Sequence, residues 1–184
     1  MALNDMQKKS AYKLGQQASK APAAPVASAA QPDWKTYADQ AQKYLSRPVF
    51  QGTPLTGQLL STAASNTFAR TGTKIPLKLA LAQAQFESGM GRKGRSPINN
   101  PYNVGEFDKK TVRKYPNTQA GVQAYFDLMA KRYLPGGRKL DDLMKSFTWA
   151  GNPRLRYASN PQYEQKLKKQ MEYIVKFLAE RKAE

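Results

Sequence analysis

The chain has 184 residues, enough for one domain with a hydrophobic core and a tail. It contains no cysteine and no histidine, which excludes disulfides, thiolate or imidazole metal ligands, and Ser-His-Asp or Cys-His catalysis. The formal net charge is +17, and residues 1–32 hold only four lysines against one aspartate, so the folded part carries most of it. Such a surface favours polyanions: nucleic acid, anionic lipid or bacterial cell-wall polymers.

The N-terminal segment differs in composition from the rest of the chain. Residues 1–20 are predicted to form a short polar helix, and residues 21–32, rich in alanine and proline, a flexible linker. We therefore expect a flexible tail over residues 1–32, a candidate docking segment, and one domain over residues 33–184. No apolar run is long enough to span a membrane, and the N-terminus lacks the apolar core of a secretory signal.

Helical periodicity begins at Asp33, which can cap a first helix that ends at Arg47-Pro48. Thr53-Pro54 has the form of an N-cap followed by proline, so a second helix is expected to begin there and to end at Gly72. The residues of the second helix expected to face inward are Leu55, Leu59, Leu60, Ala63, Phe68 and Ala69.

A third helix carries the carboxylate of greatest interest, Glu87. Ile75-Pro76 should open this helix, and Gly89 and Gly91 should end it. The negative end of the helix dipole and partial burial would both raise the pKa of Glu87. An acid still protonated near neutral pH suits proton donation to a glycosidic oxygen, although a surface glutamate that merely ends a helix fits the same local pattern.

Residues 92–117 interrupt the helices with prolines, asparagines and extended-chain formers, which predicts a small irregular lobe with a short hairpin. Helix should return at Thr118 and stop at Pro135-Gly136-Gly137; a short helix should include Phe147, and Asn160-Pro161 should cap the last one. Its buried stripe is expected to contain Tyr163, Leu167, Met171, Ile174, Val175 and Leu178. The expected fold is mainly α, a helical body with a small irregular or β lobe that forms a cleft beside Glu87.

Three blocks, taken in order, resemble the glucosaminidase-type peptidoglycan hydrolases of the lysozyme superfamily, which include the flagellar rod-assembly hydrolase and many phage and autolysin domains. Residues 81–92 resemble the family's helix ending in Glu-Ser-Gly-x-Gly, and Asn99-Asn-Pro-Tyr-Asn-Val-Gly105 resembles the asparagine-rich opening of its small lobe. In the third region, residues 114–118 precede a helix containing Ala124-Tyr125, and residues 157–167 resemble a late Tyr-Ala-x-Asp-Pro-x-Tyr-x-x-Lys segment. The family's aspartate there is Asn160, a nearly neutral exchange in a helix cap.

The resemblance implies a lysozyme-like fold and a set of site residues. The family's general acid maps to Glu87, and the tyrosine that lines its cleft maps to Tyr157. The second acidic residue is less well defined by motif; Glu106 is preferred over Asp108 because it directly follows the turn glycine. The expected substrate-binding residues are Ser88, Asn100, Tyr102, Asn103 and Tyr115. No metal or other cofactor is expected.

The function expected is cleavage of the amino-sugar backbone of peptidoglycan by general acid catalysis. A second carboxylate at the site would lead to hydrolysis. Without one, the sugar's own acetamido or hydroxyl group would complete the reaction, and the hydroxyl route would leave an anhydro end, as in lytic transglycosylases. The protein would act at the cell wall or periplasm, delivered as a virion or secretion-apparatus component through residues 1–32. The alternative is a catalytically silent basic structural or nucleic-acid-binding protein on the same scaffold.

Overall fold

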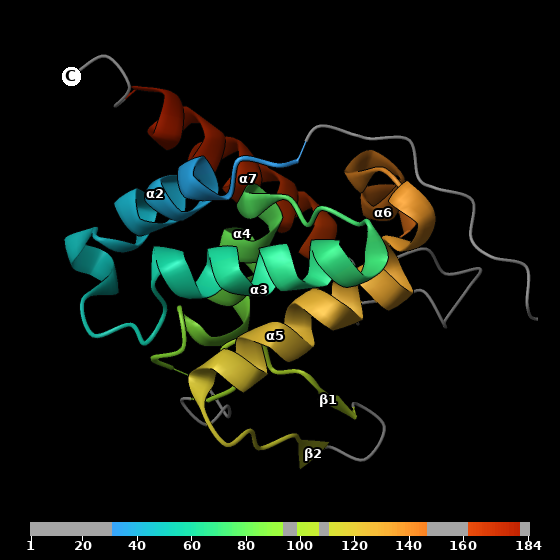
Figure 1. Ribbon diagram of the computed structural model, residues 1–184. Coiled ribbons are helices and arrows are strands. Elements are labelled where there is room, and N and C mark those ends of the chain that lie inside the picture. Colours follow the sequence, from blue (N-terminus) through green and yellow to red (C-terminus); the bar gives the residue numbers. More distant parts are fainter. Residues whose placement is uncertain (1–30, 94–98, 107–110, 147–161, 181–184) are drawn as a thin grey trace, which may run out of the picture. The chain divides into compact units, whose positions relative to one another are not determined.

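The computed structural model describes residues 31–93, 99–106, 111–146 and 162–180. The chain separates into two units, Met1–Pro32 and Asp33–Glu184, and the account below concerns the second. Its long helices are α2 (Trp34–Leu45), α3 (Gly57–Thr71), α4 (Leu77–Ser88), α5 (Thr118–Leu128), α6 (Leu140–Ser146) and α7 (Tyr163–Glu180) (Figure 1). Short helical turns occupy Pro48–Phe50, Met129–Tyr133 and Pro135–Gly137.

The predicted small lobe follows α4, as Figure 1 shows, and contains a short antiparallel hairpin. Strand β1 (Gly105–Glu106) pairs with β2 (Thr111–Val112), so that Gly105 faces Val112 and Glu106 faces Thr111. The expectation of a mainly α fold with one small irregular or β lobe is therefore confirmed. None of the helices in the described ranges is long and apolar enough to cross a membrane.

Helix α4 lies in the centre of the core. Every residue from Leu79 to Ala84 is buried, so this helix has no solvent-facing stripe over its middle turns. Helices α2 and α7 both contact α4, while α3 packs between α2 and α5. A helix that is apolar all round must be enclosed, because exposure of any face would leave hydrocarbon in water.

Helix α7 is held against α4 by a polar cluster. The Gln170 amide donates to the Tyr44 hydroxyl (2.9 Å) and to the Gln85 side-chain oxygen (3.0 Å), and the Tyr44 hydroxyl also donates to that oxygen (3.0 Å). The Arg47 guanidinium lies 5.0–5.2 Å from the ring centres of Tyr44, Phe50, Tyr173 and Phe177. These contacts fix the position of α7, whose first residue, Tyr163, reaches the site described below.

The predicted helix starts are partly confirmed. Asp33 caps α2, and its carboxylate accepts a hydrogen bond from the Thr36 N–H (2.9 Å). The expected start of the second helix at Thr53-Pro54 is wrong, because α3 begins at Gly57 with Thr56 as its cap. The Thr53 hydroxyl instead donates to the carbonyl of Met90 (2.7 Å), a partner from a distant loop that sequence spacing does not reveal.

Two residues expected to face inward do not. Ala69 is exposed, and Val175 is 49% exposed. The buried stripe of α7 is narrower than expected and consists of Leu167, Met171 and Ile174. Phe147 and the Asn160-Pro161 cap lie outside the described residues.

The loop segment that contains Asn99 and Asn100 is pressed closely against α5. A Cβ added to Gly121 of α5 would lie 1.8 Å from the carbonyl oxygen of Asn99, so only glycine allows this approach. Asn99 is in turn tied to the chain before α5, since its amide donates to the carbonyl of Tyr115 (2.9 Å). Gly121 therefore determines how closely the segment from Asn99 onward lies to the helical body.

We expect Gly121→Ala to destabilise the fold by roughly 1–3 kcal/mol, because the new methyl group must push the Asn99 backbone away from α5. The measurement is the free energy of unfolding from urea denaturation. The control is Gln119→Ala, an exposed position on the same helix turn, which should change this free energy little. Equal stability of the two variants would contradict the close packing.

Candidate active site

Glu87 lies in the last turn of α4, just before the helix ends. Gly89 adopts a left-handed conformation (φ 55°), its N–H donates to the carbonyl of Gln85 (3.0 Å), and the Met90 N–H donates to that of Ala84 (2.9 Å). This is the hydrogen-bond pattern of a helix ended by a left-handed residue, as the glycine positions predict. The carboxyl group is therefore placed near the negative end of the helix dipole, which disfavours its ionised form.

Both oxygens of the Glu87 carboxyl accept hydrogen bonds from side chains distant in the sequence. The Tyr163 hydroxyl, on the first residue of α7, donates to Oε1 (3.1 Å). The Asn103 amide donates to Oε2 (3.2 Å) and also to the backbone carbonyl of Glu87 (2.7 Å). The end of α4, the loop after it and the start of α7 thus meet at one half-buried carboxyl group.

Burial raises the pKa of Glu87, and the hydrogen bonds from Asn103 and Tyr163 oppose that shift by favouring the charged form. The net direction is upward, which confirms the expectation drawn from its position. Burial and the nearby Glu87 charge also raise the pKa of Tyr163 far above its ordinary value. Tyr163 therefore remains a neutral phenol and a hydrogen-bond donor at any pH at which the protein would work.

A second group of side chains supports this arrangement from within the core. Gln83, four residues before Glu87, is fully buried, and its side-chain oxygen accepts a hydrogen bond from the Tyr125 hydroxyl. An interaction with the Gln83 side chain also lowers the pKa of Tyr163. Tyr125 stacks on Tyr102 with ring centres 3.7 Å apart. The site is thus backed by stacked aromatic rings and a buried amide.

Two of the expected substrate-binding residues are buried and hold the loop in place. The Ser88 hydroxyl donates to the carbonyl of Pro101 (2.5 Å) and accepts from the N–H of Gly91 (2.7 Å). Asn100, also fully buried, donates to the carbonyls of Val104 and Arg113 (both 2.8 Å) and accepts from the Val104 N–H (2.9 Å). Their hydrogen-bonding groups are directed at the protein backbone.

The other expected site residues fall into three groups. Tyr102 is buried in the aromatic stack, and Tyr115 is half-buried with its pKa raised by burial. Asn103 is brought to the Glu87 carboxyl. Glu106 lies in β1, but its side chain lies outside the described residues, as do Asp108 and Tyr157. The positions of these three side chains relative to Glu87 therefore stay a prediction.

Sequence reasoning missed two aromatic residues beside Glu87. Tyr163 was interpreted only as part of a buried stripe, and Phe86 was not singled out. Phe86 is 40% exposed, although it is apolar, and its ring centre lies 6.1 Å from that of Tyr163. The signal that could have found Tyr163 is the late Tyr-Ala-x-Asp-Pro-x-Tyr pattern, whose second tyrosine it is.

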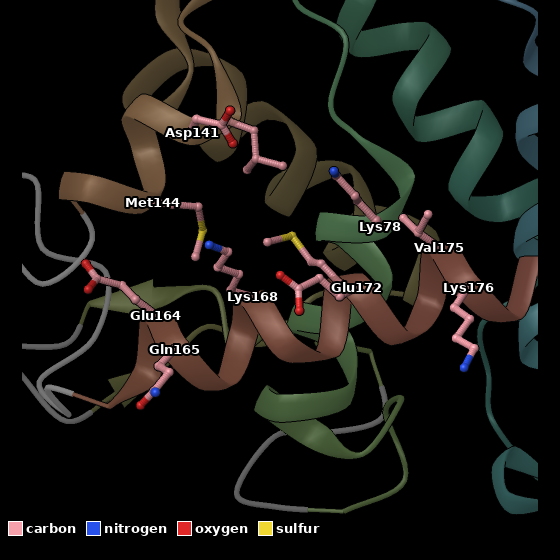
Figure 2. A pocket seen from close by; sticks show the side chains of 11 residues that line it. Lys78, Asp141, Met144, Glu164, Gln165, Lys168, Glu172, Val175 and Lys176 are labelled. Carbon is pink, nitrogen blue, oxygen red and sulfur yellow. The ribbon is translucent and has the colours of Figure 1, made fainter.

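A separate groove of about 920 Å³ lies between α6 and α7, and Figure 2 shows its walls. Its lining residues are Lys78, Leu140, Asp141, Met144, Glu164, Gln165, Lys168, Met171, Glu172, Val175 and Lys176. Glu87 is not among them, although Glu164 directly follows Tyr163. The described residues contain no group of three acidic side chains that could hold a metal ion. The carboxylates of this groove share it with lysines, unlike the half-buried Glu87.

Comparison with known proteins identifies the class of enzyme. Residues 63–175 match the family model named Glucosaminidase, described as mannosyl-glycoprotein endo-beta-N-acetylglucosaminidase. This is a lysozyme-like family, and it makes the protein a glycoside hydrolase of the kind that cleaves peptidoglycan. Because the match covers more than half of the sequence, the chain belongs to the glucosaminidase family. No curated protein and no solved structure matches the chain.

The raised pKa of Glu87 predicts how stability depends on pH. Between the ordinary value of 4.5 and the higher folded value, the folded state binds more protons than the unfolded state, so stability falls as pH rises through that interval. Glu87→Gln removes the ionisation. We therefore expect the melting temperature of Glu87→Gln minus that of the wild type to increase as the pH is raised from below 4.5 to neutral.

The matched control is Glu172→Gln, an exposed position on α7, for which the difference in melting temperature should change much less across the same pH series. Calorimetric melting temperatures give the comparison. If the difference in melting temperature between Glu87→Gln and the wild type is constant with pH, burial does not raise the pKa of Glu87.

Proposed function

We propose that the protein cleaves the glycan strands of peptidoglycan, with Glu87 as the general acid. The observation that carries this proposal is a half-buried carboxyl group with a raised pKa, enclosed by the end of α4, the Asn103 loop and Tyr163. Membership of the glucosaminidase family supports the substrate class. The position of Glu87 in the family's Glu-Ser-Gly-x-Gly motif supports the assignment of the acid.

In the proposed reaction the protonated Glu87 donates its proton to the oxygen that bridges two amino sugars. The bond between that oxygen and the anomeric carbon breaks, and positive charge develops on the sugar ring. As the proton leaves, the carboxylate that forms is stabilised by the hydrogen bonds from Tyr163 and Asn103. Burial favours the acid before the reaction, and the two donors favour the base afterwards, so both states of Glu87 have support.

The second half of the reaction has two forms. If Glu106 acts as a base or as an electrostatic partner, water attacks the anomeric carbon and the product is a reducing sugar. If no second carboxylate takes part, the hydroxyl of the sugar itself attacks and leaves an anhydro end, as in a lytic transglycosylase. We prefer hydrolysis, because the matched family is one of hydrolases.

Phe86 is the described residue best suited to contact the sugar. It is adjacent to Glu87 in the chain, it is 40% exposed, and it packs against Tyr163, which binds Glu87. An exposed aromatic ring beside a polar group is a typical feature of a binding site, because it offers apolar contact next to hydrogen-bonding groups. We propose that Phe86 packs against a sugar ring next to the bond that is cleaved.

The route by which the enzyme reaches the wall remains a prediction from the sequence. We propose that residues 1–32 dock the enzyme to a phage particle or secretion apparatus, and the high positive charge suits retention on anionic wall polymers. The second candidate function, binding of nucleic acid by a silent scaffold, has the net charge of +17 as its support. It would be favoured by salt-sensitive DNA binding combined with no release of sugar fragments.

The first test is digestion of purified peptidoglycan by the wild type and by Glu87→Gln. Loss of the acid should reduce the rate by roughly 10²–10⁴-fold, because that is the usual contribution of general acid catalysis. Mass analysis of the released fragments identifies the sugar at the new end. N-acetylglucosamine at the new reducing end indicates a glucosaminidase, and N-acetylmuramic acid at that end indicates a muramidase. An anhydro sugar there indicates a transglycosylase.

Glu172→Gln serves again as the control, since Glu172 lies on the exposed face of α7 and should leave the rate unchanged. Both variants must show the wild-type circular dichroism spectrum. Full activity of Glu87→Gln would remove the acid assignment, while absence of fragments from the wild type would reject the proposed function as a whole.

The second test concerns Phe86. We expect Phe86→Ala to raise KM for soluble glycan fragments by roughly 3- to 10-fold with a smaller effect on kcat, which corresponds to about 1 kcal/mol of lost contact. Phe86→Tyr keeps the ring and should retain most of the affinity. Unchanged kinetics in the alanine variant would show that the ring does not touch substrate.

A further inference from the structure

Asn103 has a backbone conformation that residues with a side chain seldom adopt. Its φ is +51°, in the left-handed region, which costs roughly 1 kcal/mol in most residues and less in asparagine. The conformation is held from both sides: the Asn103 N–H donates to the carbonyl of Asn100 (3.2 Å), and the Asn100 side chain bonds both backbone groups of Val104. The turn thus delivers the Asn103 side chain to a fixed place.

The orientation of the Asn103 amide is fixed as well. Its nitrogen donates to the backbone carbonyl of Glu87 (2.7 Å) and to the carboxyl oxygen Oε2 (3.2 Å). If the amide were turned over, its oxygen would face the Glu87 carbonyl, and two acceptors would repel each other. The amide therefore presents a donor to Glu87 whether or not the carboxyl group is protonated.

A donor fixed in this way does not treat the two states of Glu87 equally. The ionised carboxylate accepts the hydrogen bond on either oxygen, and a bond to a charged acceptor is about twice as strong as a neutral one. The protonated acid gains less and must direct its own O–H away from the amide nitrogen. Burial pushes the ionisation of Glu87 in the opposite direction, and the hydrogen bond from Asn103 is the larger of the two that counter it.

We propose that Asn103 is a positioning residue for Glu87: its amide fixes the carboxyl group against the end of α4 and favours the ionised form of that group. The inference rests on the proposed role of Glu87 as the acid. The hydrogen bond from Asn103 would lower the pH at which Glu87 loses its proton. It would also stabilise the carboxylate that forms when the proton is donated.

The other titratable groups that face Glu87 within the described ranges are phenols. Tyr163 of α7 donates to its carboxyl group, and Tyr125 of α5 is close enough for the Glu87 charge to raise its pKa slightly. Burial raises the pKa of both phenols, so neither becomes charged in the working pH range. A change in the ionisation of Glu87 on removal of the Asn103 amide would therefore not be masked by these groups.

Two variants of the full chain separate the effect of the Asn103 amide from the effect of the backbone conformation at that position. Asn103→Gly removes the amide and suits the left-handed backbone, whereas Asn103→Ala removes the amide and adds strain. The ionisation of Glu87 is followed by ¹³C NMR of its carboxyl carbon, and the alkaline limb of the pH–rate profile is measured on peptidoglycan. Asn66→Ala, an exposed asparagine of α3, is the control.

We expect both Asn103 variants to move the NMR titration of Glu87 and the alkaline limb to higher pH by the same amount. The melting temperature of the alanine variant should be lower than that of the glycine variant, because alanine adds strain to the left-handed backbone. An unchanged NMR titration in Asn103→Gly overturns the proposal. A shifted titration with an unmoved pH–rate profile supports the contact between Asn103 and Glu87 and counts against Glu87 as the acid. The NMR measurement needs no activity, so a failure of the proposed function remains distinguishable.

Discussion

The candidate site depends on one constraint: Glu87 lies in the last turn of α4, a helix whose middle turns are completely buried. The middle turns of α4 are enclosed by its neighbours, so the backbone around Glu87 has little freedom. A carboxyl group in this position loses hydration, and the resulting penalty falls on its charged form. The same enclosure that stabilises the core therefore favours the protonated form of Glu87, which is the form that its proposed role as general acid requires.

Two hydrogen bonds from distant parts of the chain partly offset this penalty on the charged form of Glu87. Tyr163 from α7 and Asn103 from the loop each donate to one oxygen of Glu87, and both favour the carboxylate. Their positions are set by separate structural devices: the Gln170 cluster orients α7, and the close approach at Gly121 sets the loop. The site is therefore assembled with the help of two packing interactions, each of which can be altered without touching the carboxyl group itself.

Sequence reasoning succeeded where local chemistry determines the outcome. Gly72 and Gly89 end their helices in the left-handed conformation that glycine favours, and the small lobe appears where proline and asparagine break the helical pattern. It failed where a distant partner decides, as at Thr53, whose hydroxyl binds Met90 and does not cap a helix. Val175 lies at a periodic position of α7 but stays 49% exposed, because periodicity does not say how wide the contact with the next helix is.

From the sequence alone follow the mainly helical fold, the small lobe after the third helix and the choice of Glu87, because helix ends, breakers and motifs are local patterns along the chain. Only the tertiary structure decided which side chains reach Glu87. Ser88 and Asn100, which were expected to bind substrate, hydrogen-bond to the protein backbone, whereas Tyr163 hydrogen-bonds to Glu87. The physical reason is that a side chain's partners depend on how separate elements pack. The spacing of residues within one segment does not say which residues of another segment will lie beside it.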